Sequence, residues 1–262
     1  PKSCLINIFC IFLACHFLKK AFDFYLNSSI HVGLAVWCLV KLTNYEASDY
    51  ALLVFFGTIV GYNFLKYSEW FLSNKGLRFN IVGIISVTLI ASGGFLLLFL
   101  KQEFKVQWSL IVALGLVIVY PFFRKIGWLK PFFVSCVVSY ITVLIPSKTV
   151  ENINWYYIQR LLLLSSVMIP FEILDSTTDS VSMKTLPHLF GIPRTKQIGY
   201  GLVVLFIIVS LLLTDNLYFY SIFAFSSIVA IYFSSEKRSW YYTSFWVESL
   251  PIIWWLISIV FQ

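Results

Sequence analysis

Long continuous runs of apolar residues, separated by short polar connections, dominate the chain. Each run is close to the length of about 20 residues that an α-helix needs to cross the hydrocarbon core of a membrane. We expect nine spanning segments, over residues 24–43, 49–67, 79–100, 106–122, 130–146, 155–174, 197–213, 217–234 and 242–261. Apolar and polar positions do not alternate within the runs, which argues against the strands of an outer-membrane barrel. The pattern therefore predicts an all-α, polytopic membrane protein.

The composition supports this fold class. Hydrophobic residues make up 60% of the chain and charged residues only 12%, whereas a typical soluble domain is about 25% charged. The net charge of +7 is scattered over short connections rather than gathered in one patch, so we expect no nucleic-acid partner. The five cysteines lie in apolar runs and lack the spacing of metal ligands.

The beginning of the chain is a separate case. An apolar run over residues 4–18 is followed by Lys19 and Lys20. It is short for a span and resembles the hydrophobic part of a signal segment or an interfacial helix. We therefore expect an N-terminal extension over residues 1–20, to which we assign no role, followed by a single transmembrane domain over residues 21–262.

Basic residues concentrate in alternate connections. The connections after the second, fourth, sixth and eighth segments hold Lys66, Lys75, Arg78, Arg124, Lys125, Lys130, Lys184, Arg194, Lys196, Lys237 and Arg238. The other connections hold only Lys41, Lys101, Lys105 and Lys148. Because cytoplasmic loops carry the excess of Lys and Arg, we expect an integral protein of a bacterial cytoplasmic membrane, with the basic connections on the cytoplasmic side.

The most informative polar motif follows the sixth segment. Asp175 and Asp179 are four residues apart, a spacing that puts both carboxylates on one helix face, where they can point at one cation. Glu172 adds a third carboxylate within one turn. Such charges at a membrane boundary need a counter-ion, and Mg²⁺ holding a phosphate is the expected one. The simpler interpretation is a helix end that emerges into water with solvated acidic side chains.

These residues resemble the second aspartate-rich motif of the UbiA superfamily of intramembrane prenyltransferases. The shared pattern is D-x-x-x-D, K-T-L-P and L-x-G, represented here by Asp175, Asp179, Lys184–Pro187 and Leu189–Gly191. The nine segments and the place of the motif after the sixth also match. The resemblance implies a helical bundle with a lipid-open cavity, in which two acidic motifs hold Mg²⁺ against an isoprenoid diphosphate. The metal and basic residues would stabilise the leaving diphosphate, and the cavity would keep water from the allylic cation.

The first motif of that family, N-D-x-x-D-x-x-x-D, is altered in this chain. Its matching stretch begins at Asn63, and aromatic residues stand at all three aspartate positions, namely Phe64, Tyr67 and Phe71. Without these aspartates the usual second Mg²⁺ lacks its ligands. Asp175 and Asp179 are therefore the candidate metal ligands. The candidate diphosphate contacts are Lys184, Arg194, Lys196, Asn63 and Lys66, and the candidate substitute acids are Glu69 and Glu172.

Three functions are compatible with these motifs. The first is Mg²⁺-dependent transfer of an isoprenoid chain from a polyprenyl diphosphate to an acceptor that the motifs do not define. Ionisation drives that reaction, so no general base is assigned. The second is a catalytically silent UbiA-like protein that binds a lipid phosphate or a partner, which the altered first motif favours. The third, a transporter, would need ionisable groups at mid-membrane depth on several helices, and the spans offer few beyond Arg160 and Glu248.

Overall fold

A computed structural model describes residues 17–44, 46–73, 81–147, 152–179, 181–213 and 217–260. Its long helices after a first helical segment, Phe17–Asn27, are α2 (Ile30–Thr43), α3 (Ser48–Ser73), α4 (Ile81–Leu100), α5 (Phe104–Arg124), α6 (Lys130–Ser139), α7 (Ile153–Asp175), α8 (Leu186–Leu213), α9 (Leu217–Phe233) and α10 (Leu250–Val260). Short 3-10 or π segments are η1 (Gly127–Leu129), η2 (Tyr140–Leu144), η3 (Val181–Met183) and η4 (Tyr242–Val247). Within these ranges all regular structure is helical, which confirms the predicted all-α class.

The helices have the length and surface of membrane spans. Seven of those described are long and apolar enough to cross a membrane, and an eighth span results if Phe17–Asn27 and α2 form one bent span. α9, with 17 residues, is a shorter apolar helix. Large apolar side chains stay exposed, among them Leu89 and Ile90 on α4 and Leu212 on α8, as suits contact with lipid. The chain is an integral membrane protein, and each of the nine predicted segments overlaps helical structure.

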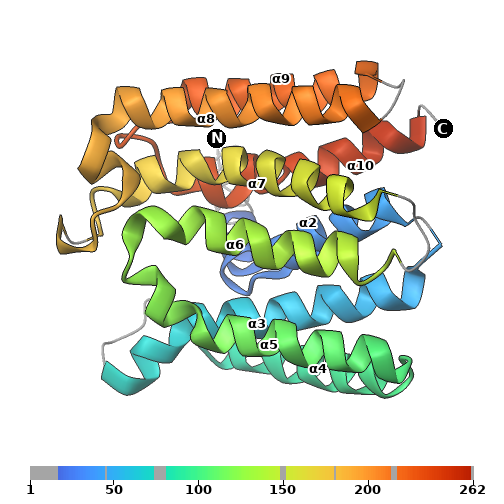
Figure 1. The fold of residues 1–262 in the computed structure, drawn as a ribbon. Coiled ribbons are helices and arrows are strands. Elements are labelled where there is room, and N and C mark those ends of the chain that lie inside the picture. The colour runs from blue at the N-terminus through green and yellow to red at the C-terminus, as the bar shows by residue number, and fades with distance from the viewer. Residues whose placement is uncertain are drawn as a thin grey trace, which may run out of the picture.

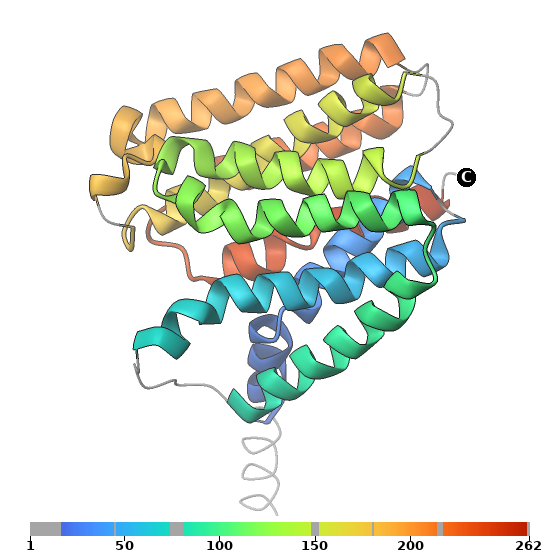
Figure 2. The same cartoon turned by 60° about the horizontal axis from the view of Figure 1, so that its bottom comes forward.

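The helices lie side by side in one bundle. α8 and α9 form one flank, and α3 and α4 form the opposite flank in both views (Figures 1 and 2). α3, α5, α7 and α9 all finish at the same end of the bundle, on the left in Figure 1. The connections that carry most of the basic residues therefore begin at one end, as the alternation along the sequence predicts.

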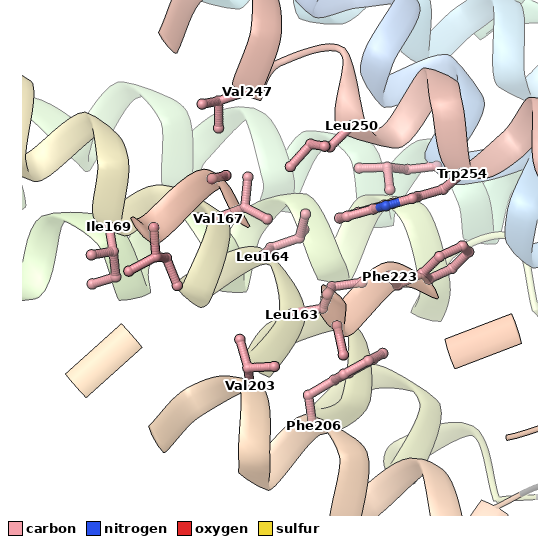
Figure 3. Close-up of a cluster of buried hydrophobic side chains, with 14 of the residues drawn as sticks. Leu163, Leu164, Val167, Ile169, Val203, Phe206, Phe223, Val247, Leu250 and Trp254 are labelled. Carbon is pink, nitrogen blue, oxygen red and sulfur yellow. The ribbon is translucent and has the colours of Figure 1, made fainter. Parts of the chain in front are cut away.

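A buried apolar cluster fixes α7 in the bundle. Side chains from α7, α8, α9 and α10 converge in it (Figure 3). Trp254 of α10 is fully buried, stacks on Phe223 of α9 with ring centroids 4.9 Å apart, and donates its indole N–H to Ser226 Oγ at 2.8 Å. The buried indole nitrogen therefore has a partner, as a tightly packed tryptophan requires. Because α7 is held on several sides, the polar residues at its end have a fixed position.

Two predicted boundaries are wrong. The segment over residues 24–43 is not one straight helix, because the chain bends by 55° between Asn27 and Ile30, where Ser29 has φ 62°. The segment predicted over 197–213 begins earlier, since α8 starts at Leu186 and continues across a kink at Gly191, whose φ is 75°. The backbone of Gly191 is not helical, so α8 consists of two helices that meet at this residue, and the predicted turn at Gly191 is confirmed. Most of the predicted extension over residues 1–20 lies outside the described residues, and the lipid-open cavity stays a prediction.

Candidate functional site

The end of α7 carries the acidic motif. Asp175 is the last residue of the helix, and its carbonyl oxygen accepts hydrogen bonds from the backbone N–H groups of Thr178 at 2.9 Å and Asp179 at 2.8 Å. The helical rotation thus continues for one more turn, which keeps Asp179 on the same side as Asp175. Glu172 lies one turn earlier and is fully buried. We call Glu172, Asp175 and Asp179 the acidic cluster.

A lysine from another part of the chain points into the acidic cluster. Lys130, the first residue of α6, donates hydrogen bonds from Nζ to Asp175 Oδ2 at 2.9 Å and Asp179 Oδ2 at 3.3 Å. The same Nζ atom lies 3.3 Å from Glu172 Oε1. Neither Glu172 oxygen makes a hydrogen bond, so this third contact is an ion pair only. The two aspartates do face one cation, as their spacing predicts, and that cation is Lys130.

The acidic cluster runs from the interior toward the surface. The side chain of Glu172 is 0% exposed, that of Asp179 8% and that of Asp175 42%. A second cation reaches the cluster from the end of α5, where Arg124 Nη2 lies 4.0 Å from Asp179 Oδ1. Three carboxylates therefore face one buried ammonium and one partly exposed guanidinium, so the site retains a net negative charge if all five groups are ionised.

The start of α8 is hydrogen-bonded to the backbone just after Asp175. His188 Nε2 donates to Ser176 O at 3.1 Å, and Thr185 Oγ1 donates to His188 Nδ1 at 3.0 Å, in the neutral tautomer that satisfies both contacts. Ser176 Oγ in turn donates to Glu236 Oε1 at 3.1 Å. Of the three histidines, His188 is the one in the motif, and in the structure it holds two segments of backbone together.

Three of the four basic residues predicted to bind diphosphate follow the acidic motif along the chain and differ in their surroundings. Lys184 and Arg194 are exposed, and Lys184 has φ 51°. Lys196 is half-buried and donates from Nζ to Tyr232 O at 2.8 Å, near the end of α9. In the described part of the chain the ion pairs of the two aspartates are with Lys130 and Arg124, so the structure does not bring these three cations onto the acidic cluster.

The candidates on α3 take part in packing contacts. Asn63 is buried, accepts from Ser29 Oγ at 2.6 Å and donates to Ser28 O at 3.1 Å and Thr88 Oγ1 at 2.9 Å. Lys66 Nζ lies 3.3 Å from Asn27 Oδ1. These contacts tie α3 to the bend before α2. Glu69 belongs to α3, but its side chain falls outside the described part.

Two further charged residues, Lys130 and Glu248, belong to no recognisable sequence motif. In the sequence, Lys130 is one of many basic residues in the connections between spans. Its position at the first residue of a predicted span is the signal that could have singled it out. Glu248 lies between η4 and α10, at the residue that follows η4. A carboxylate inside a span is the signal that marks Glu248.

The acidic cluster does not fit a metal ion as it stands. Carboxylate oxygens are suitable ligands for Mg²⁺, but the point that the three carboxylates share is taken by Lys130 Nζ. Within the described ranges no group of three or more His, Cys, Asp or Glu side chains is arranged to hold a metal ion. The Mg²⁺ expected from the sequence therefore stays a prediction, to which we assign no step.

Comparison with known proteins shows a shared fold. No model of a known protein family matches the chain, and no curated protein matches its sequence. The structure is similar to that of a digeranylgeranylglyceryl phosphate synthase studied in membranes, with a TM-score of 0.53 and 16% sequence identity. The similarity covers 92% of this chain and 96% of the synthase, so it extends over the whole bundle rather than one helical hairpin.

Proposed function

We propose that this protein is a UbiA-like membrane prenyltransferase that transfers an isoprenoid chain from a polyprenyl diphosphate to an acceptor. The observation that carries the proposal is the fold shared with the synthase over almost the full length of both chains. The product named for that synthase carries two geranylgeranyl groups, which are isoprenoid chains. We extend this substrate class to the present protein. The acidic cluster at the end of α7 is the proposed reaction site.

The proposed reaction is a substitution at the allylic carbon. The bond between that carbon and the diphosphate oxygen breaks, and the diphosphate leaves with the electron pair. The acceptor forms a new bond to the same carbon and loses a proton. We assign Lys184 and Arg194 to the diphosphate because both follow the acidic motif along the chain and have exposed side chains, and cations stabilise the leaving charge. We place this end of the bundle on the cytoplasmic side.

Release of diphosphate tests the proposal. Purified protein in detergent is incubated with geranylgeranyl diphosphate or a longer polyprenyl diphosphate, in Mg²⁺ and in EDTA. We expect release by the wild type and its loss in an Asp175→Ala/Asp179→Ala variant. The matched control is Glu46→Ala/Asp49→Ala, which removes two exposed carboxylates at the opposite end of the bundle and should keep the wild-type rate. Equal release by the wild type and the Asp175→Ala/Asp179→Ala variant would contradict the assigned site.

The second candidate is a silent protein of the same fold that binds a lipid phosphate. Two observations favour it: Lys130 already neutralises part of the acidic cluster, and aromatic residues replace the aspartates of the first motif. Binding of radiolabelled polyprenyl diphosphate in the same samples separates the two candidates. Retention of the intact lipid without release of diphosphate would support the silent protein and rule out the transferase.

A further inference from the structure

Lys130 is held in the acidic cluster by the fold rather than by its sequence neighbours. It lies 45 residues before Asp175 and 49 before Asp179 along the chain. Pro131 follows it in the first turn of α6, a position where proline favours the start of a helix. Only 9% of the Lys130 side chain is exposed. The ammonium therefore has a fixed place, and the three carboxylates are its immediate surroundings.

The charges explain why a cation must be present. Glu172 is fully buried and Asp179 nearly so, and a buried carboxylate without a counter-ion is costly. The cluster holds these two groups and the partly exposed Asp175 within about two helical turns. Arg124 reaches only Asp179, at 4.0 Å. Lys130 is the cation that touches all three carboxylates, so it supplies the neutralising charge that a metal ion would otherwise supply.

The distances show that an ammonium, and not a metal, fits this arrangement. The oxygens of Asp175, Asp179 and Glu172 lie at 2.9, 3.3 and 3.3 Å from Nζ, which are hydrogen-bond or ion-pair distances. Mg²⁺ requires oxygens at about 2.1 Å, so the carboxylates would have to close in by about 1 Å and the ammonium would have to leave. The two cations compete for one position.

We infer that Lys130 replaces the divalent cation of this site, so that the acidic cluster is neutralised by the chain itself and binds no Mg²⁺ while Lys130 is present. Phosphate groups that approach the cluster then do so without a bridging metal, and the partly exposed cation that they meet there is Arg124. This inference depends on the contacts of the site and not on the proposed transfer reaction, because metal binding is measured without turnover.

Removing the ammonium should open a metal site. Lys130→Met keeps the aliphatic bulk and removes the charge, and Lys125→Met removes an exposed lysine of the same connection as the control. Metal-free proteins in detergent are titrated with Mn²⁺, and the free ion is followed by electron paramagnetic resonance. We expect Lys130→Met to bind one Mn²⁺ ion per chain. Its dissociation constant should be at least ~10-fold lower than that of the wild type. Lys125→Met should behave as the wild type, and adding Asp179→Asn to Lys130→Met should abolish the new binding.

Two results would overturn the inference. One is a folded Lys130→Met variant that binds Mn²⁺ no better than the wild type. The other needs no lysine variant and therefore holds even if Lys130→Met fails to fold: saturable Mn²⁺ binding by the wild type that disappears in Asp179→Asn. Loss of diphosphate release in the assay above has no bearing on either result, so failure of the proposed function and failure of this inference are distinguishable.

Discussion

Gly127 packs directly against the backbone carbonyl of Met183. A Cβ atom at Gly127 would lie 2.3 Å from Met183 O and 2.7 Å from Thr185 N, distances that no side chain can occupy. The segment between α5 and α6 thus touches the segment between α7 and α8 backbone to backbone. This contact joins the chain that leads into Lys130 with the chain that follows Asp179, and only glycine permits it.

Gly127→Ala should therefore lower stability. The methyl group meets backbone rather than a movable side chain, so the two segments must separate, at a cost of about 1–3 kcal/mol. The control is Gly115→Ala on α5, where an added Cβ meets nothing within 4 Å and a helical Gly→Ala change is neutral or stabilising. Thermal unfolding in detergent measures both. Equal midpoints for the two variants would contradict the close contact.

Asn63→Ala should destabilise the fold rather than weaken ligand binding selectively. The amide makes three hydrogen bonds, to Ser29, Ser28 and Thr88, and its removal leaves buried partners unsatisfied, at a cost of about 2 kcal/mol. Ser86→Ala is the control, because that exposed hydroxyl bonds only within its own helix, to Val82 O. A wild-type unfolding midpoint combined with weakened polyprenyl diphosphate binding would instead make Asn63 a ligand contact.

Replacing Glu172 and replacing Lys130 should change the free energy of unfolding by different amounts. Glu172→Gln leaves Lys130 with Asp175 and Asp179 and removes one of three mutually repelling charges, so we expect stability to change by less than about 1 kcal/mol. Lys130→Met leaves the buried carboxylates without their shared cation and should cost about 3–5 kcal/mol in EDTA. Unfolding of both variants in the same detergent gives the comparison. Equal losses would show that Lys130 and Glu172 act as a simple pair.

Features that depend on neighbouring residues in the sequence were predictable, whereas contacts between residues far apart in the sequence were not. Apolar segment length located the helical regions, because a membrane span is set by a count of consecutive residues, but it did not show the bend at Ser29 or the short length of α9. The spacing of Asp175 and Asp179 correctly predicted that both carboxylates lie on one face, where they meet Lys130, whereas the Mg²⁺ expected between them stays a prediction. The identity of that cation depends on Lys130, which arrives from another connection, and no local pattern encodes such a pairing. The bend at Ser29 is equally non-local, since it is held by Asn63 from a helix 34 residues away.

Arg160 shows how an intramembrane charge can serve the fold. It lies on α7, and its guanidinium donates from Nη1 to Leu39 O at 3.0 Å and from Nη2 to Thr43 Oγ1 at 3.2 Å. Both acceptors belong to the last turns of α2, where the helix dipole favours a positive charge. The two donor groups of one planar side chain thus fasten α7 to the end of α2, a role that differs from the one a transport pathway would require.

Replacing Arg160 should therefore weaken the contact between α7 and α2. Arg160→Met removes both hydrogen bonds and should cost about 2–3 kcal/mol. Arg160→Lys keeps the charge but cannot reproduce the fork of two donors, so its unfolding midpoint should lie between those of Arg160→Met and the wild type. Lys105→Met, at an exposed position near the start of α5, controls for loss of charge alone. If Arg160→Met kept wild-type stability but abolished ion flux in proteoliposomes, the transporter hypothesis would replace this structural role.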